Sequence, residues 1–381
     1  MELSRRRFMG LAATAALAAA GWSLVGCSSG DGGGDKGAPS LTAQPEQRDL
    51  MDSSDACAVR VGSVIGPPAM GMTQFMLAAK AKKTFNDFSF NLDYAVDYQA
   101  LSAAFNQGDF DICVMPSNIG PIMYNNSELK NEYQVISVNN LGVLYVMTTD
   151  GSISSFEDLA GRTVYAYGAG GTPEFTIQAL LKKMGLENSF TLEFKSTPFE
   201  ILNLMQQEEN CIAILPQPFV SLSKIMVNNL HVPIDITVEW NKAFSDTGSQ
   251  AVTTITCVNK SFLEQHEQAV IEYLKMAGQS VAWTLDNMQQ AAALQEELGT
   301  FLNNEVALDA MPYISMVCMT GVPMRTALSG FLAELYAANP DSVGGALPDD
   351  GFYYLPPTGQ ISDEEIGVAQ AANERSESEL S

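Results

Sequence analysis

Residues 163–174, TVYAYGAGGTPE, place a short strand, a glycine-rich turn and a helix start in direct succession. Residues 163–167 are rich in β-branched and aromatic side chains, which favour a strand. Thr172-Pro173-Glu174 then predicts a helix start, with threonine as the N-cap, proline at the first helical position and an acid in the first turn. An apolar stripe from Ile177 to Met184 continues this helix as far as Gly185. Strand, turn and helix thus follow one another in the order of an α/β sheet.

The same order continues to residue 218. A second strand is predicted at 190–194, a second helix that Ser196-Thr197-Pro198 opens, and a third strand at 211–215, which Pro216-Gln217-Pro218 ends. Because helices connect these strands, we expect the strands to pair in parallel within a βαβαβ unit.

An earlier segment of the chain has the same layout. Its predicted elements are a strand at 59–64, a loop at 65–71, a helix with apolar residues at 72, 75, 76 and 79, a strand at 90–96, a helix at 99–106 and a strand at 111–115, which Pro116-Ser117-Asn118 ends. Two βαβαβ units predict an α/β protein of two lobes, each a mostly parallel sheet flanked by helices.

The remaining segments suggest how the lobes are connected. Residues 135–148 are expected to form a strand that crosses between the lobes, and residues 253–258 the return crossing, so that the hinge has two crossings. Apolar residues at helical spacing predict further helices at about 261–287, 289–302 and 324–338. The expected lobes are residues 58–145 plus 253–357 for lobe 1, and residues 149–250 for lobe 2.

The N-terminus has the pattern of an export signal. Residues 4–9, SRRRFM, match a twin-arginine signal, and an apolar run at 11–25 leads to LVGC at 24–27, a lipoprotein cleavage box. The alternative is a transmembrane anchor, but the run is shorter than the roughly 20 residues that span a bilayer. We expect residues 1–27 to be a signal peptide, Cys27 to be lipidated, and the mature protein to be extracytoplasmic and anchored to the cell membrane by lipid. Residues 28–57 are expected to be a flexible linker, and residues 361–381 an acidic tail.

The composition is strongly acidic, with 44 Asp and Glu against 20 Lys and Arg. Such a surface repels nucleic acid, which excludes that class of partner. We interpret it as a solubility adaptation; a surface that selects cations is the alternative. After Cys27, the cysteines follow no metal-ligand spacing. Cys113 and Cys211 are expected to be buried thiols, and the others leave one disulfide open as an alternative.

Ligands of open α/β sheets bind at the carboxyl ends of strands, beside helix N-termini. Here these positions are the loops at 65–71, 97–99, 116–118, 168–173, 196–198 and 216–219, none of which contains Lys or Arg. A neutral or aromatic solute, or an anion held by backbone N–H groups, therefore fits better than an anion held by a guanidinium. With the hinge residue Tyr145 and with Trp240, the candidate ligand-binding residues are Pro67, Pro68, Met70, Gly71, Tyr98, Gln99, Ser117, Asn118, Tyr145, Gly170, Gly171, Thr172, Gln217, Phe219 and Trp240.

Each candidate also has a structural interpretation. The prolines and glycines suit turns, Thr172 suits a helix cap, and the aromatic residues and Met70 suit a core. No catalytic signature of the GxSxG, HExxH or P-loop kind occurs, and we expect His231 and His266 to be surface residues. The loop at 168–171 is no dinucleotide fingerprint, because the position of its third glycine is Pro173. We expect no enzyme, cofactor or metal site.

The chain resembles solute-binding lipoproteins of ABC importers, in the branch for nitrate, sulfonates, taurine and thiamine precursors. The matching segments are GPPAMG at 66–71, GDFD at 108–111, SFEDLAGRT at 155–163, GAGGTPE at 168–174 and PQPF at 216–219. Family members often have Glu-Pro at the position of Gln217-Pro218, so this chain lacks a carboxylate there. The resemblance implies a two-lobe periplasmic-binding-protein-like fold that closes on a small solute.

The resemblance also implies the partners. These are a small organic solute, such as a sulfonate or a thiamine precursor, and an ABC permease with its ATPase, with the binding protein acting as a monomer. Two alternatives remain open from the sequence: an extracellular enzyme of the same fold, and a sensor domain that passes its solute to a membrane receptor.

Overall fold

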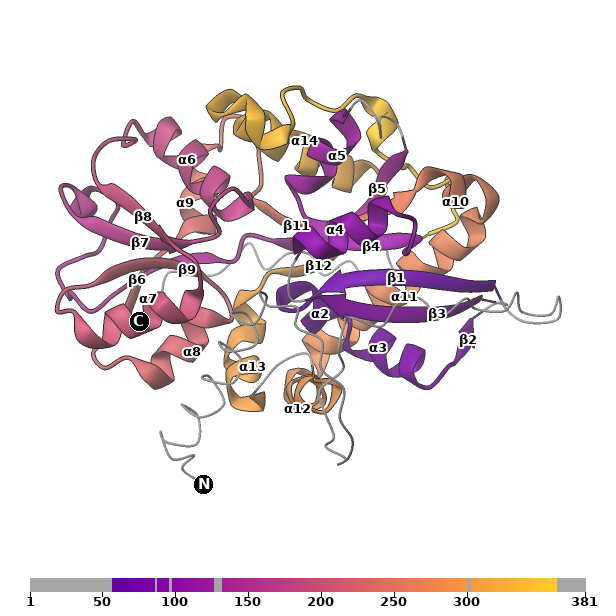
Figure 1. Cartoon of the computed structure of the whole chain (residues 1–381), viewed down its shortest axis with the longest axis horizontal. Coiled ribbons are helices and arrows are strands. Elements are labelled where there is room, and N and C mark those ends of the chain that lie inside the picture. Colours follow the sequence, from indigo (N-terminus) through magenta and orange to yellow (C-terminus); the bar gives the residue numbers. More distant parts are fainter. Residues whose placement is uncertain (1–56, 86–87, 96–97, 127–131, 300–302, 362–381) are drawn as a thin grey trace, which may run out of the picture. The chain divides into compact units, whose positions relative to one another are not determined.

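The computed structural model describes residues 57–85, 88–95, 98–126, 132–299 and 303–361, which form two β-sheets covered by helices (Figure 1). The predicted signal peptide, the lipidation site at Cys27, the linker up to residue 56 and the acidic tail from residue 362 lie outside the described residues. Among the described residues, no helix is both long and apolar enough to cross a membrane.

The first sheet has seven strands in the order β12-β5-β11-β4-β1-β3-β2. Its centre is the first predicted βαβαβ unit, in which β1 pairs in parallel with β3 and β4. On one side of this unit, β11, β5 and β12 add antiparallel strands, and β2 adds one on the other side. The strands are β1 (Cys57–Val64), β2 (Thr84–Phe85), β3 (Phe88–Ala95), β4 (Ile112–Pro116), β5 (Tyr133–Leu141), β11 (Val252–Asn259) and β12 (Met316–Met319).

The second sheet has five strands in the order β10-β6-β9-β7-β8. The second βαβαβ unit forms its parallel part, with β7 between β8 and β9, as β1 lies between β3 and β4. The strands are β6 (Leu144–Thr148), β7 (Thr163–Tyr167), β8 (Thr191–Lys195), β9 (Ile212–Pro216) and β10 (His231–Asp235). Below, the first lobe means the seven-stranded sheet with the helices packed on it, and the second lobe means the five-stranded sheet with its helices.

The predicted two-lobe α/β fold is confirmed, with one difference in the sheets. Both sheets are mixed rather than mostly parallel. In the first sheet, β11 pairs antiparallel with β4 and β5, and in the second sheet β6 pairs antiparallel with β9. The crossing predicted as one strand at residues 135–148 consists of two strands. Strand β5 ends at Leu141, β6 begins at Leu144, and Gly142-Val143 connects them. The lobe boundaries given above stay a prediction.

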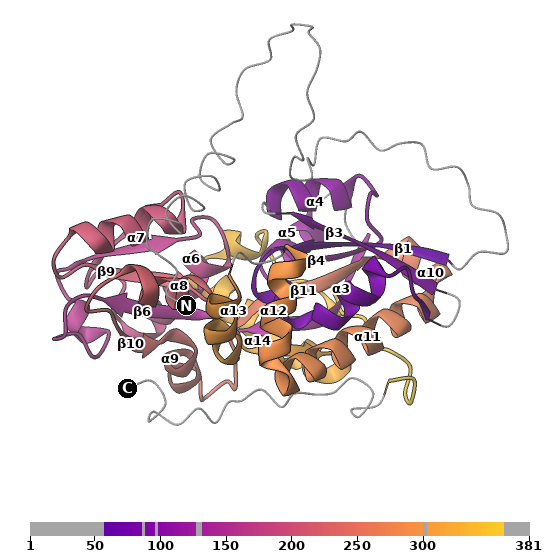
Figure 2. The same cartoon turned by 90° about the horizontal axis from the view of Figure 1, so that it is seen from below.

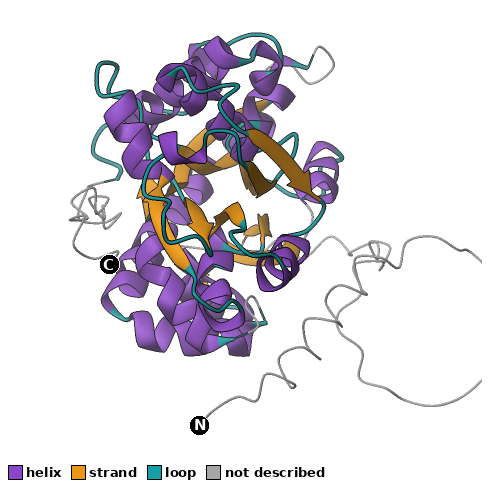
Figure 3. Cartoon of the chain, turned by 90° about the vertical axis from the view of Figure 1, so that its left-hand side faces the viewer, coloured by secondary structure: helices purple, strands orange, loops and turns teal. Residues whose placement is uncertain are grey.

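Helices cover both faces of each sheet, so that the strands lie between them (Figure 3). In the first lobe, α2, α3, α11 and α12 pack together on one face, while α4 and α5 pack on strands of the other (Figure 1). In the second lobe, α6 packs with α9 and α7 with α8 (Figure 2). The helices are α2 (Pro67–Gly71), α3 (Thr73–Lys80), α4 (Tyr98–Asn106), α5 (Ile119–Asn125), α6 (Thr172–Met184), α7 (Pro198–Gln207), α8 (Phe219–Met226), α9 (Ile236–Ala243), α10 (Lys260–Gln265), α11 (Glu267–Asp286), α12 (Met288–Leu298), α13 (Asn304–Ala310) and α14 (Gly321–Ala338), with short 3₁₀ turns at Glu157–Leu159, Met311–Tyr313, Pro340–Val343 and Asp350–Phe352.

Two further segments differ from the sequence prediction. The loop expected at 65–71 contains the short helix α2, because paired prolines at its start preset helical φ angles. The helix expected at 261–287 is divided into α10 and α11 at His266, which ends the first helix and begins the second.

Helix α14 packs against both lobes. It contacts α6 of the second lobe and also β5 and β11 of the first. Phe331 of α14 is fully buried, and its ring centroid lies 5.1 Å from that of Trp240 on α9. Aromatic side chains at this separation contribute both buried area and ring contact. The two lobes therefore share one apolar core on the α14 side.

The cysteines are mostly core residues. Cys113 and Cys211 are buried, as predicted, and so are Cys257 and Cys318, while Cys57 is half-buried. All five are free thiols in the structure, so the alternative of a disulfide is not realised among them. Burial raises the pKa of the Cys211 thiol to about 12.

We predict that Gly142→Ala destabilises the protein by about 1–3 kcal/mol, because it overpacks the link between the two sheets. A Cβ atom at Gly142 would lie 2.1 Å from the buried Oγ1 atom of Thr237 on α9. Urea unfolding measures the change in the free energy of unfolding. The control is Gly330→Ala within α14, where the nearest atom to the new Cβ is 3.7 Å away, and where alanine is favoured by up to about 1 kcal/mol. Equal free energies for the two variants would contradict the close approach at Gly142.

Candidate functional site

The carboxyl ends of two parallel strands, one in each lobe, meet at a small polar cluster. Ser117 and Asn118 follow β4, and Thr172 begins α6 after β7. The Thr172 hydroxyl donates to Oδ1 of Asn118 at 2.8 Å and lies 3.4 Å from Oγ of Ser117. The backbone N–H of Asn118 donates to Oγ1 of Thr172 at 3.4 Å. We call these three residues the junction cluster, because they connect the two lobes.

The junction cluster is removed from solvent. Ser117 and Asn118 are fully buried, and Thr172 is 3% exposed. The Ser117 hydroxyl is held by the first lobe, since it donates to the carbonyl oxygen of Val252 at 2.6 Å. Nδ2 of Asn118 is buried and has no acceptor among the described residues. An unsatisfied buried donor costs about 1–3 kcal/mol, so this amide is suited to an acceptor atom supplied by a ligand.

The glycine-rich loop before α6 explains why Thr172 is available for this contact. Gly171 is the N-cap of α6, and Thr172 is its first residue, so the prediction of a threonine cap was wrong. Glu174 serves the helix start instead, because its Oε2 accepts from the N–H of Gly170 at 2.7 Å. The Thr172 side chain is therefore free to cross to the other lobe. Gly168 has a φ of +98°, and a Cβ there would lie 2.8 Å from Pro173, so the turn requires glycine.

Two backbone donors of this loop are already engaged. The N–H of Gly170 is bound by Glu174, and that of Gly171 donates to the carbonyl oxygen of Gly168 at 3.1 Å. The predicted site residues Gly170 and Gly171 thus shape the turn. Tyr98, at the start of α4, has its hydroxyl 3.8 Å from where a Cβ on Gly171 would lie, so the first lobe approaches the loop closely there.

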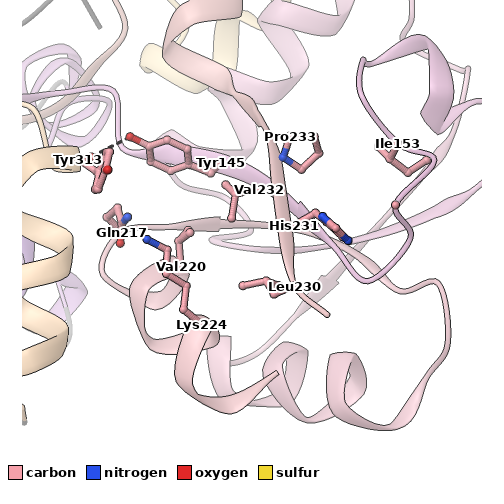
Figure 4. Close-up of a pocket in the computed structure, with 11 residues that line it drawn as sticks. Tyr145, Ile153, Gln217, Val220, Lys224, Leu230, His231, Val232, Pro233 and Tyr313 are labelled. Carbon is pink, nitrogen blue, oxygen red and sulfur yellow. Dashed lines mark hydrogen bonds between the residues drawn. The ribbon is translucent and has the colours of Figure 1, made fainter. Parts of the chain in front are cut away.

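A cavity of about 520 Å³ lies beside the second sheet and contains two further predicted residues, Tyr145 and Gln217 (Figure 4). The Tyr145 hydroxyl donates to the carbonyl oxygen of Tyr313 at 3.0 Å. Oε1 of Gln217 accepts from the Ser221 hydroxyl at 3.0 Å and from its N–H at 3.2 Å. The lining residues are Tyr145, Gly151, Ile153, Gln217, Val220, Lys224, Leu230, His231, Val232, Pro233 and Tyr313.

The remaining candidates lie apart from these two groups. Helix α2, with Pro67, Pro68, Met70 and Gly71, packs on β12 and α11 of the first lobe. Phe219 begins α8, where its ring meets that of Phe199 edge to face, with centroids 5.9 Å apart. Gln99 is exposed on α4, and Trp240 belongs to the shared core, where its Nε1 donates to Ser249 at 3.3 Å.

The sequence prediction contained two of the eleven lining residues, and its omissions include the polar residues Lys224, His231 and Tyr313. Lys224 lies inside α8, outside the loops that the prediction emphasised, one helical turn beyond Val220 and on the same face. Its Nζ pairs with Oδ2 of Asp309 at 2.9 Å and lies 5.4 Å from the ring centroid of Tyr313. His231 is exposed, as predicted, yet it lines the cavity. The spacing of Val220 and Lys224 was the available signal.

Solved structures with the same fold are known. A chain described as an ABC transporter from Parabacteroides distasonis is 18% identical, with a TM-score of 0.65 over 79% of this chain and 99% of that chain. The periplasmic aliphatic sulphonate binding protein SsuA from Escherichia coli is 16% identical, with a TM-score of 0.62 over 79% of this chain and 92% of that chain. The desulfurization enzyme DSZB is 11% identical, with a TM-score of 0.54 over 78% of this chain and 96% of that chain.

At these identities the similarity establishes the fold, which is the two-lobe fold of periplasmic binding proteins. No protein-family model matches the sequence, and a search of curated proteins gave no match. Within the described ranges, His, Cys, Asp and Glu side chains form no group of three or more that could hold a metal ion.

We predict that Thr172→Val lowers the free energy of unfolding by about 1–3 kcal/mol, because it leaves Oδ1 of Asn118 buried without a donor. The control is Thr176→Val on the same helix, whose hydroxyl donates only to the carbonyl oxygen of Thr172 at 2.7 Å. A double-mutant cycle with Asn118→Ala should give a coupling energy of about 0.5–3 kcal/mol for Thr172 and nearly none for Thr176. Additive effects of Asn118→Ala and Thr172→Val would show that the lobes do not make this contact in solution.

Proposed function

We propose that the protein is an extracytoplasmic solute-binding lipoprotein of an ABC importer, which captures a small organic solute between its lobes and delivers it to a permease and its ATPase. The observation that carries this proposal is the junction cluster, where the strand ends of both lobes meet around the unused amide donor of Asn118. The solved structures of similar fold support it, since they include a periplasmic aliphatic sulphonate binding protein. We accordingly propose a sulfonate, a thiamine precursor or a related compound as the solute.

The proposed mechanism is the closure of the lobes on the solute. A ligand shifts an equilibrium between open and closed forms only by its differential affinity for them. Groups that contact the solute from both lobes supply this difference, and Asn118 and Thr172 belong to opposite lobes. A solute atom that accepts a hydrogen bond from Nδ2 of Asn118 would satisfy this buried donor in the closed form. The closed, loaded form is then the one that the permease recognises.

The test is a thermal-shift screen of purified protein against sulfonates, nitrate, pyrimidines, thiamine precursors and amino acids. A ligand at a hundred times its Kd should stabilise the protein by about 2.7 kcal/mol. Asn118→Ala and Thr172→Val should each reduce the shift, because each removes a polar group from the junction cluster, whereas Thr176→Val should leave it unchanged. A shift that survives both junction substitutions would contradict the proposed position of the site.

Lipid anchoring is a second part of the proposal, and it rests on the sequence at 24–27. One acyl chain binds a membrane only marginally, so a stable anchor needs two or more lipid signals at the cysteine. We predict that Cys27→Ala moves the protein from the membrane fraction to the soluble fraction of the producing cells, as measured by fractionation and immunoblotting. The matched control is Ser28→Ala, one residue along the chain. A Cys27→Ala protein that stays with the membrane would show that the anchor is something else.

An enzyme of the same fold is the alternative from another class, and the similarity to the desulfurization enzyme DSZB is the observation that favours it. Mass spectrometry of the bound solute after prolonged incubation distinguishes the two functions. An unchanged solute supports capture and delivery, and a chemically altered one supports catalysis. For a sensor, the solute would also remain unchanged, but the gene would lie beside a receptor rather than beside a permease and an ATPase.

A further inference from the structure

The cavity beside the second sheet is separate from the junction cluster. It runs along β6 and β10 under α8. Among its lining residues, only Tyr313 lies outside the second lobe, in the 3₁₀ turn that precedes β12 of the first lobe. None of the three junction residues lines it. A function of this cavity therefore goes beyond the solute site proposed above.

The two ends of the cavity differ in chemistry. Figure 4 shows Tyr145, Gln217 and Tyr313 towards one end and Ile153 at the other. Leu230, which directly precedes β10, and Val232 and Pro233, which lie on it, form an apolar part of the cavity wall. An elongated molecule with a polar head and an apolar body matches this division, and a volume of about 520 Å³ is in the range of small-molecule sites.

Gln217 provides a fixed donor at the polar end. Its side chain is 2% exposed, and Ser221 occupies its oxygen with two hydrogen bonds. The hydrogen bonds from Ser221 fix the orientation of the amide, and its NH₂ group has no acceptor among the described residues. Nε2 of Gln217 is not among the fully buried atoms that lack a partner, so it keeps contact with solvent. A ligand in the cavity that carries an acceptor can therefore reach it.

Lys224 provides a charge at the same end, and its present partner is easily replaced. The side chain extends from α8 towards the end where Gln217 and Tyr313 lie (Figure 4). Its ion pair with Asp309 is half-exposed, with the two side chains 44% and 43% accessible. Ion pairs of this exposure contribute little to stability, so an anion held also by Gln217 can compete with Asp309.

We propose that this cavity is a second small-molecule site, which binds an organic anion with a short apolar body. The anionic head accepts from Nε2 of Gln217 and from the Lys224 ammonium, and the body lies along Ile153, Leu230 and Val232. Because Asp309 is on α13 and Lys224 is on α8, the bound anion replaces a contact between the two lobes. Occupancy of the second site thereby changes how readily the lobes separate.

The experiment is isothermal titration calorimetry of the full mature protein with hexanoate, hexane-1-sulfonate, 1-hexanol and hexylamine. We expect the two anions to bind and the alcohol and the amine not to bind. Lys224→Gln should weaken anion binding at least about ten-fold, because the anion loses a hydrogen bond to a charged group. Asp309→Asn should strengthen it about three-fold, because it removes the competing carboxylate. Whichever anion binds more tightly identifies the head group as carboxylate or sulfonate.

The matched control is Lys242→Gln, which removes a lysine of the same lobe that pairs with Glu239 at 3.0 Å on α9, away from the cavity. It should leave anion binding unchanged. Equal affinity in the wild type and Lys224→Gln, no gain in Asp309→Asn, or equal binding of hexylamine would overturn the second site. Circular dichroism and urea unfolding of each variant establish that it is folded. The increase in anion affinity expected for Asp309→Asn cannot result from unfolding, because unfolding would only lower the affinity.

The same titrations separate this inference from the proposed function. Anion binding in the cavity should persist in Thr172→Val, which disturbs only the junction cluster. Loss of anion binding in that variant would assign the anion to the cleft between the lobes and overturn the second site. Anion binding that persists while the whole solute screen fails would support the second site and count against solute capture at the junction.

Discussion

The constraint on which the structure depends is the parallel pairing of strands that helices connect. Such strands end at the same edge of a sheet, so each βαβαβ unit collects its following loops at one edge. The chain contains two units with the same strand arrangement, β3-β1-β4 and β8-β7-β9. The contact between Asn118 and Thr172 exists because these two edges face each other. A cluster of short polar side chains from distant parts of the sequence is a direct consequence of this topology.

The contacts between the lobes differ in kind from one side to the other. On the α14 side, Phe331 and Trp240 are fully buried within one continuous apolar core. At the strand ends and at α8, the contacts are single hydrogen bonds and the half-exposed pair of Lys224 and Asp309. Apolar packing of this extent costs far more to separate than such polar contacts. For the proposed closure, the α14 side suits the axis and the polar side suits the face that opens. Trp240 is buried in the core on the α14 side, and its role in ligand binding stays a prediction.

The sequence predicts the repeat units well, because their alternation of apolar strands and striped helices is a local property. Strand β7 has the predicted bounds, and α7 is opened by the predicted segment, with Thr197 as its N-cap. One local detail failed for a tertiary reason: Gly171 rather than Thr172 caps α6, since the threonine hydroxyl binds Asn118 of the other lobe. Of the cavity residues, Tyr145 and Gln217 were among the predicted candidates. Lys224 was not, because the spacing of Val220 and Lys224 does not show which way this face of α8 points until the helix is packed on the sheet. The partner Asp309 is still farther along the chain.

Both candidate sites present the NH₂ group of an amide to the ligand. This explains how a protein with a strongly negative charge can bind a ligand that is an anion or carries acceptor atoms. At Asn118 and at Gln217, a neighbouring hydroxyl donates to the amide oxygen and leaves the NH₂ group as the unused function. Each site therefore selects acceptor atoms in its ligand. The chain as a whole has a formal charge of −24, which repels anions at long range. Salt screens this repulsion beyond about 10 Å, whereas an oriented donor acts at hydrogen-bond distance. The acidic surface thus slows the approach of an anion more than it weakens its binding, and affinity depends on the oriented amides and on Lys224.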